Sequence, residues 1–304
     1  MALALTCALG CKRAPSEIAN KDPATQQAAA ALSLIPPDAE IVLSLDLERL
    51  RGQTAWTTVL SALTKDTRPF LGGFAAGTGL DVARQLRHVL IALPAERQGD
   101  DRFVLVADTA PLDEARVTAW LHARLGEKAA VFVRNKSQIV ISQGAWSGTM
   151  AALTSAAKLT PSAADHVELL RLCARAAVEH GLWFAAVVPV TVRRALMKEP
   201  SLPEVAAIAR GFGFIDLNSG AHVEVVAELS NTPDATELAH RLGVYLNQAK
   251  RHPEMLVRGL APYLESVRLA ADDARVHATI DLSGEQLGEC IERIEALAHT
   301  AWTK

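Results

Sequence analysis

Apolar and polar residues alternate along several short runs of the chain, a pattern typical of strands with a buried face. Residues 41–47 read Ile-Val-Leu-Ser-Leu-Asp-Leu, and residues 182–188 form a comparable run. Two pairs of similar runs follow each of these, and a turn-forming segment separates the members of each pair, which predicts β-hairpins. The paired runs are 88–93 with 103–107, 130–133 with 138–142, 213–217 with 222–229, and 267–270 with 275–282.

Between the strands, apolar residues recur every three or four positions, which is the period of a helix with one buried face. The stretch from Trp56 to Leu63 shows this spacing. Residues 72–81, by contrast, hold four glycines and predict a loop. Further helices are expected at 111–125, 145–157, 167–179, 192–208, 232–246 and 285–299.

The same order of elements occurs twice, which we interpret as an internal duplication. Each unit reads strand, helix, hairpin, helix, hairpin, helix. Successive hairpins require a largely antiparallel sheet, so the expected fold class is α+β, with two similar units whose helices pack on one face of the sheet. The predicted organisation is a signal, lipid-anchor and tether segment at 1–36, a first repeat at 37–160 and a second repeat at 161–304.

The N-terminal segment 1–11 is small and apolar and ends abruptly at two basic residues. It resembles the signal peptide of bacterial lipoproteins, in which a small residue precedes the cysteine that receives the lipid. The resemblance implies that Cys11 carries diacylglycerol and holds the protein at a membrane surface in the cell envelope. Residues 12 to about 27 would be the tether. The alternative is that Cys11 is a plain thiol in a frayed tail, and the protein would then be cytoplasmic.

Composition narrows the possible functions. Half of the 304 residues are apolar and 21% are charged, a balance that favours a folded chain. The net charge of -3, without a long basic run, argues against nucleic-acid binding. The sequence contains no apolar run of about 18 residues, so we expect no membrane-spanning helix and membrane attachment would need a lipid.

Four cysteines are present, and two of them, Cys7 and Cys11, belong to the predicted signal segment. Cys173 and Cys290 lie in separate predicted helices of the body. They would form one disulfide in an oxidising compartment, or they are two small core residues, which is the commoner role of free cysteines. Their spacing, and that of the histidines, does not suggest a zinc site.

Candidate catalytic residues are few. Ser147 stands in Gly-Ala-Trp-Ser-Gly, which departs from the Gly-x-Ser-x-Gly of hydrolases, so we expect it near a helix start. His88, His222 and His277 lie in or beside strands and are expected to be partly exposed sheet residues. The glycine-rich segment lacks the Gly-Lys-Ser/Thr of a phosphate-binding loop. We therefore expect no catalytic residue, no metal site and no cofactor.

The arrangement as a whole, including Gly77-Thr78-Gly79-Leu80-Asp81 before a strand, resembles a family of uncharacterised bacterial envelope proteins with a duplicated body, over roughly residues 36–200. This resemblance implies an envelope location and no particular reaction. The sequence favours a non-enzymatic envelope lipoprotein that binds another envelope component or acts as a scaffold. The alternatives are a carrier or chaperone for an apolar ligand, and an enzyme whose site is dispersed along the chain.

Overall fold

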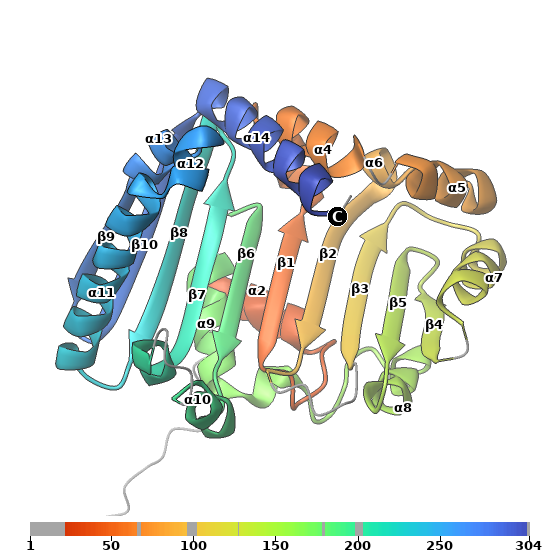
Figure 1. Ribbon diagram of the computed structural model, residues 1–304. Coiled ribbons are helices and arrows are strands. Elements are labelled where there is room, and N and C mark those ends of the chain that lie inside the picture. Colours follow the sequence, from red (N-terminus) through yellow and green to blue (C-terminus); the bar gives the residue numbers. More distant parts are fainter. Residues whose placement is uncertain are drawn as a thin grey trace, which may run out of the picture.

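The computed structural model describes residues 22–65, 68–95, 102–126, 128–177, 180–197 and 203–302. The predicted signal segment and Cys11 lie outside these residues. The fold is one open sheet of ten antiparallel strands in the order β4-β5-β3-β2-β1-β6-β7-β8-β10-β9 (Figure 1). The strands are β1 Ile41–Asp46, β2 Leu86–Leu93, β3 Phe103–Thr109, β4 Ala129–Arg134, β5 Gln138–Gln143, β6 Leu182–Val187, β7 Ile208–Asp216, β8 Gly220–Leu229, β9 Val267–Asp272 and β10 Arg275–Ser283.

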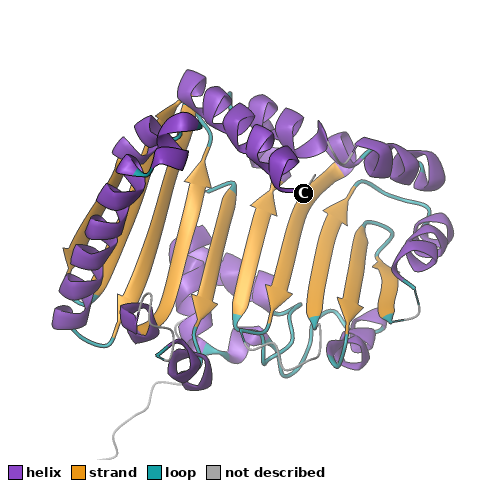
Figure 2. Ribbon diagram, in the orientation of Figure 1, coloured by secondary structure: helices purple, strands orange, loops and turns teal. Residues whose placement is uncertain are grey.

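Helices surround this sheet, and the α+β class expected from the sequence is confirmed (Figure 2). They are α2 Pro23–Leu32, α3 Leu47–Arg51, α4 Trp56–Lys65, α5 Arg68–Thr78, α6 Val82–Gln85, α7 Glu114–Leu125, α8 Trp146–Ala151, α9 Val167–Ala177, α10 Val190–Leu196, α11 Thr232–Arg251, α12 Pro253–Val257, α13 Ala261–Glu265 and α14 Gly284–Trp302. None of the helices in the described ranges is both long and apolar enough to cross a bilayer.

The two halves of the chain contribute their strands in the same order outward from a central seam, where β1 pairs with β6. The seam is closed by matching hydrogen bonds: the Asp46 amide donates to the Gly181 carbonyl at 2.7 Å, and the Val187 amide donates to the Glu40 carbonyl at 2.8 Å. The pairing of β2 with β3 and that of β7 with β8 each shift register at corresponding positions. These matches agree with the predicted repeat of elements. A duplication as their origin stays a prediction.

One face of the sheet, here called the back face, is covered by α2 and α9, which lie behind the strands in Figure 1. Leu32 of α2 and Leu169 and Leu172 of α9 are fully buried there against strand residues such as Val42 and Val104. The predicted tether, residues 12 to about 27, therefore overlaps the start of α2, and the predicted boundary at residue 36 falls after this packed helix. Alanines and one leucine spaced along α2 provide the buried side, and Asp22 caps its first turn by accepting from backbone amides.

The opposite side, the front face, also carries helices. Val117 and Leu121 of α7 pack on β2 to β5, and Ala235 and Leu238 of α11 pack near Val276 of β10. The expectation that helices cover one face only is therefore wrong. The reason is visible in β3, where Val104 and Val106 face the back cluster while Leu105 and Ala107 face the front cluster. Both faces of the central strands are apolar, and both need cover.

The predicted loop at 72–81 is helical as far as Thr78, because α5 continues through three of its four glycines. Gly77 lies against the indole of Trp120 on α7, and a Cβ placed on it would come within 2.2 Å of that ring. A larger residue would prevent this contact between α5 and α7. The segment turns only at Gly79, whose φ of 77° suits glycine, and Asp81 then caps α6.

Candidate functional site

The front face has an apolar floor between its two flanking helices, α7 and α11, near the middle of the sheet. We define the apolar floor as Leu43, Ile91, Leu105, Phe184 and Val225. Register aligns these residues on one row: Leu43 stands opposite both Ile91 and Phe184, and Ile91 stands opposite Leu105. Val225 joins the row through Gly213, which pairs with Phe184 on its other side.

The apolar floor is less covered than the back of the same strands. Val225 is 36% exposed, and the other four residues are half-buried. On the back face, Val42, Val104 and Val226 of these strands are fully buried. Five of six neighbouring strands thus place aliphatic and aromatic side chains on a partly open surface, and the sixth, β7, contributes Gly213; such a surface often marks a binding site.

Phe184 gives the apolar floor its one aromatic ring. A Cβ built on Gly213 would come within 2.6 Å of a ring carbon of Phe184 and 2.5 Å of the Glu224 carbonyl oxygen. The ring therefore lies across the glycine, directly on the backbone of β7. This close approach explains why a strand interior, where glycine is normally unfavourable, contains glycine at this point.

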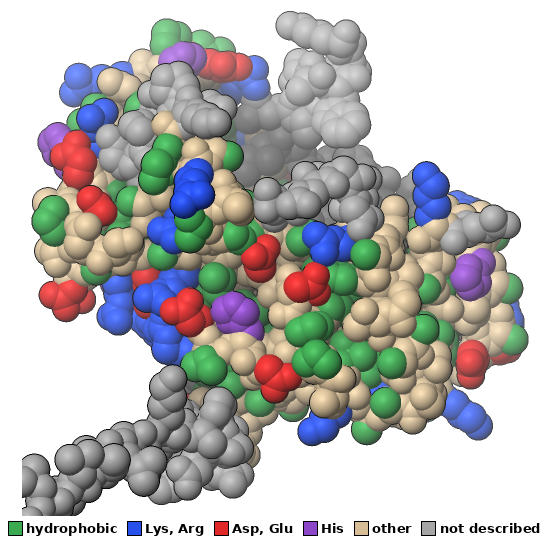
Figure 3. Space-filling view, turned by 90° about the horizontal axis from the view of Figure 1, so that it is seen from below, with side chains coloured by type: hydrophobic (Ala, Val, Ile, Leu, Met, Phe, Trp, Pro, Cys, Tyr) green, Lys and Arg blue, Asp and Glu red, His purple; other side chains and the backbone are tan. Residues whose placement is uncertain are grey.

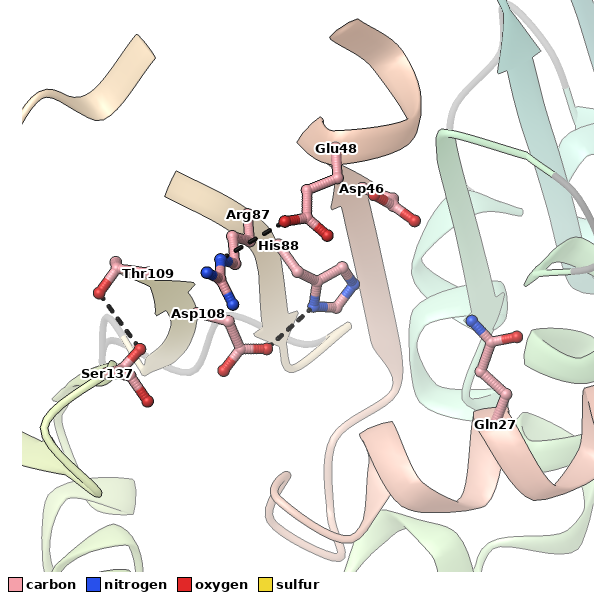
Figure 4. Close-up of a pocket in the computed structure, with 8 residues that line it drawn as sticks. All are labelled: Gln27, Asp46, Glu48, Arg87, His88, Asp108, Thr109 and Ser137. Atoms are coloured by element: carbon pink, nitrogen blue, oxygen red, sulfur yellow. Dashed lines mark hydrogen bonds and ion pairs between the residues drawn. The ribbon is translucent and has the colours of Figure 1, made fainter. Parts of the chain in front are cut away.

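A polar hollow of about 460 Å³ lies on the back face at the end of β1, and Gln27 of α2 contributes to its lining (Figure 4). His88 points toward Asp108 across two neighbouring strands, with Nδ1 3.7 Å from Oδ2, and Glu48 approaches Arg87 at 3.4 Å. The hollow is lined by Gln27, Asp46, Glu48, Arg87, His88, Asp108, Thr109 and Ser137.

Asp108 is held in its ionised form. Burial raises the pKa of this carboxyl, but the nearby His88 imidazole, the hydrogen bond from Gln138 and the charge of Arg134 outweigh burial, so that the pKa is lowered. The Gln138 amide donates to Asp108 at 2.7 Å. Asp108 is therefore a carboxylate that orients neighbouring polar groups, and as such it cannot supply a proton near neutral pH.

Ser44 completes a serine, histidine and carboxylate trio that the sequence analysis missed. Its Oγ lies 2.7 Å from Nε2 of His88, on the opposite side of the imidazole from Asp108. This is the order of groups in a serine hydrolase. However, Ser44 is 1% exposed in the middle of a strand, and the 3.7 Å separation from His88 to Asp108 exceeds a hydrogen bond. A substrate has no access to the hydroxyl, whose role here is to bond the imidazole.

The other histidines singled out in the sequence also have carboxylate partners on the back face. His222 Nδ1 lies 2.6 Å from Asp281, and His277 Nδ1 lies 3.1 Å from Glu224. The sequence placed these histidines on strands but did not indicate their partners, because each pair joins two strands whose register was unknown. Over the described part of the chain, no three potential metal ligands gather into a site.

The remaining predicted residues do not converge on these surfaces. Ser147 lies in the first turn of α8 and donates to the Ser142 carbonyl at 3.3 Å. Cys173 is buried in the back-face core and Cys290 is partly exposed on α14, and both are free thiols. Burial raises the pKa of both thiols, which makes them poor nucleophiles.

Comparison with known proteins adds little to this picture. No family model matches the chain, and no curated protein matches it. A solved structure, crystal form I of TP0453, is similar over 86% of this chain and 96% of its own, with a TM-score of 0.44 and 8% sequence identity. So loose a likeness says nothing of what this chain binds.

Proposed function

We propose that the chain is a non-enzymatic lipoprotein of the bacterial envelope, anchored through Cys11, which binds an apolar ligand on the front face. The observation that carries the proposal is the apolar floor: half-buried to exposed aliphatic and aromatic residues in register across six central strands. This proposal combines two of the hypotheses drawn from the sequence, an envelope binding protein and a carrier of an apolar ligand.

The chemistry of the apolar floor favours hydrocarbon over peptide. The strands that form it are paired on both sides, so that their backbone groups bond one another. The row itself offers aliphatic and aromatic carbon. A bound peptide would lose hydration of its amides without recovering hydrogen bonds, a cost of roughly 1–3 kcal/mol per group. An alkyl chain has no such cost and gains roughly 0.8 kcal/mol per buried methylene.

Binding is tested with cis-parinaric acid, a fatty acid that fluoresces when its chain leaves water. We expect the full chain to bind it, and Val225→Gln to weaken binding about tenfold, since a polar amide would enter the apolar floor. Val257→Gln is the matched control: the same substitution, at a valine of α12 that is 87% exposed, should leave the affinity unchanged.

A second copy of the chain is the competing occupant of the front face. In that case sedimentation would show a concentration-dependent dimer that Val225→Gln dissociates, and parinaric acid would not bind. That pair of results would contradict the proposed ligand class.

The anchor is tested separately by feeding cells a radiolabelled fatty acid. Label should enter the native chain and Cys7→Ala, and it should be lost in Cys11→Ala. Equal labelling of all three chains, or of none, would remove the lipid anchor from the proposal and leave the apolar floor untouched.

A further inference from the structure

Four arginines surround one buried carboxylate at the end of β8. Arg171 of α9 donates to Glu228 with two nitrogens, at 2.7 and 3.4 Å, and Arg175 donates at 2.5 Å. Arg210 of β7 lies 2.8 Å and Arg275 of β10 lies 3.5 Å from the carboxylate oxygens. The Glu228 side chain is 6% exposed at their centre. Figure 3 looks at this end of the molecule, where basic side chains gather beside acidic ones.

The four arginines carry more positive charge than Glu228 can neutralise and more hydrogen-bond donors than its carboxylate can accept from. A carboxylate offers about four lone-pair sites, whereas four guanidiniums hold about twenty N–H groups. Glu168 accepts one further bond, from Arg210, and Asp273 lines the same hollow. Asp272 of β9 stands opposite Arg275, so four positive charges face four negative ones, while the guanidinium N–H groups still outnumber the bonds that the carboxylates accept. The side chains of Arg171 and Arg275 remain 41% and 42% exposed, so both can be reached from solvent.

Stabilising Glu228 does not by itself explain this cluster. One bidentate guanidinium would neutralise the carboxylate, and each further arginine adds repulsion from its like-charged neighbours. Arg175 is additionally fixed over the ring of Phe212, 4.3 Å from its centre, so it cannot move away to relieve this repulsion. A bound anion would relieve it, and planar guanidinium forks match the oxygens of a phosphate.

We propose that the hollow of about 250 Å³ between Arg171, Arg210 and Arg275 binds a phosphate group. The phosphate belongs either to a small soluble anion or to a phospholipid headgroup. The site is confined to the second half of the chain, because the positions that correspond to Arg210 and Glu228 by strand register are occupied by His88 and Asp108 in the first half. It lies on the back face, away from the apolar floor, and does not depend on the function proposed above.

Binding of inorganic phosphate to the full chain is measured by calorimetry at low ionic strength. We expect Arg275→Gln and Arg171→Gln each to weaken it about tenfold. Arg268→Gln on β9 is the matched control, since this exposed arginine lies on the same face and its loss changes the net charge equally. The phosphate affinity of Arg268→Gln should stay within about twofold of that of the native chain. Thermal unfolding of each variant confirms that it is folded, and Arg275, the most distant from Glu228, is the safest of the four to remove.

A second arm uses vesicles of phosphatidylcholine with and without phosphatidylglycerol. Vesicle binding that needs phosphatidylglycerol and is lost in Arg275→Gln, without binding of free phosphate, would assign the headgroup. Binding of free phosphate assigns the soluble anion. Absence of binding in both arms, or equal weakening by Arg275→Gln and Arg268→Gln, would overturn the proposed site.

Discussion

At the residue scale, Glu228 is the acid that its surroundings perturb most among the residues that the structure describes. Burial raises the pKa of its carboxyl, but hydrogen bonds and charges from Arg171 and Arg175 outweigh burial and lower the pKa from 4.5 to about 2. A carboxyl whose pKa is lower in the folded than in the unfolded chain stabilises the fold fully above the unfolded value. That contribution is lost as the pH falls from about 4.5 toward 2.

We therefore expect the unfolding free energy of the native chain to drop by roughly 2 kcal/mol more than that of Glu228→Gln over this acid range, allowing for partial screening by solvent. Urea denaturation at a series of pH values measures the difference. Glu224→Gln, on the same strand and face, keeps Glu228 and should keep the native pH dependence. Identical acid sensitivity of native chain and Glu228→Gln would show that Glu228 does not contribute in this way.

The sequence did not predict which side chains contact one another. The histidines at 88, 222 and 277 were correctly expected on strands, yet their carboxylate partners, and the arginines around Glu228, were not foreseen. Those contacts join strands and helices far apart in the chain. They depend on register and helix placement, for which local patterns carry no signal.

At the element scale, α5 shows how packing overrides intrinsic preference. Glycines disfavour a helix by about 1 kcal/mol each relative to alanine, so the segment 72–81 was expected as a loop. The contact between Gly77 and Trp120, in which the glycine meets the indole directly, explains its helical state. The hairpins, by contrast, were all confirmed, because each depends on residues close in sequence.

The same substitution should have opposite effects at two positions of α5. Gly77→Ala places a methyl group into the Trp120 ring and should destabilise the chain by about 1–3 kcal/mol. Gly72→Ala meets no heavy atom within 4 Å and should stabilise it, by up to about 1 kcal/mol, through helix propensity. Urea denaturation of the two variants provides the measurement, and a stabilising Gly77→Ala would contradict the close packing of α5 on α7.

At the scale of the whole molecule, the seam between β1 and β6 unites the two predicted repeats into one sheet. The boundary at 160/161 therefore separates segments that share a core, since α2 of the first half packs against α9 of the second. The sequence predicted the order of elements within each half, but not this seam, which pairs residue 41 with residue 186.

Cutting the chain at 160/161 should consequently leave neither half folded as a monomer. The first half would expose the β1 edge and the buried back of β2 and β3, while the second would expose β6 and α9. We expect each fragment alone to aggregate or self-associate, and the two together to restore a one-to-one complex with native circular dichroism. Gel filtration of separate and mixed fragments checks this, and a stable monomeric half would argue for two independent domains.

An open sheet has two edge strands, which in this sheet are β4 and β9. Each is six residues long and leaves one row of amides without a neighbouring strand. Charged side chains, such as the exposed Arg268 and Asp272, stand along β9, and Arg134 on β4 donates to the Ala156 and Ala157 carbonyls. Short edge strands that carry charged side chains disfavour pairing with the edge strands of another molecule. The sheet can therefore be wide and open without extending into fibrils.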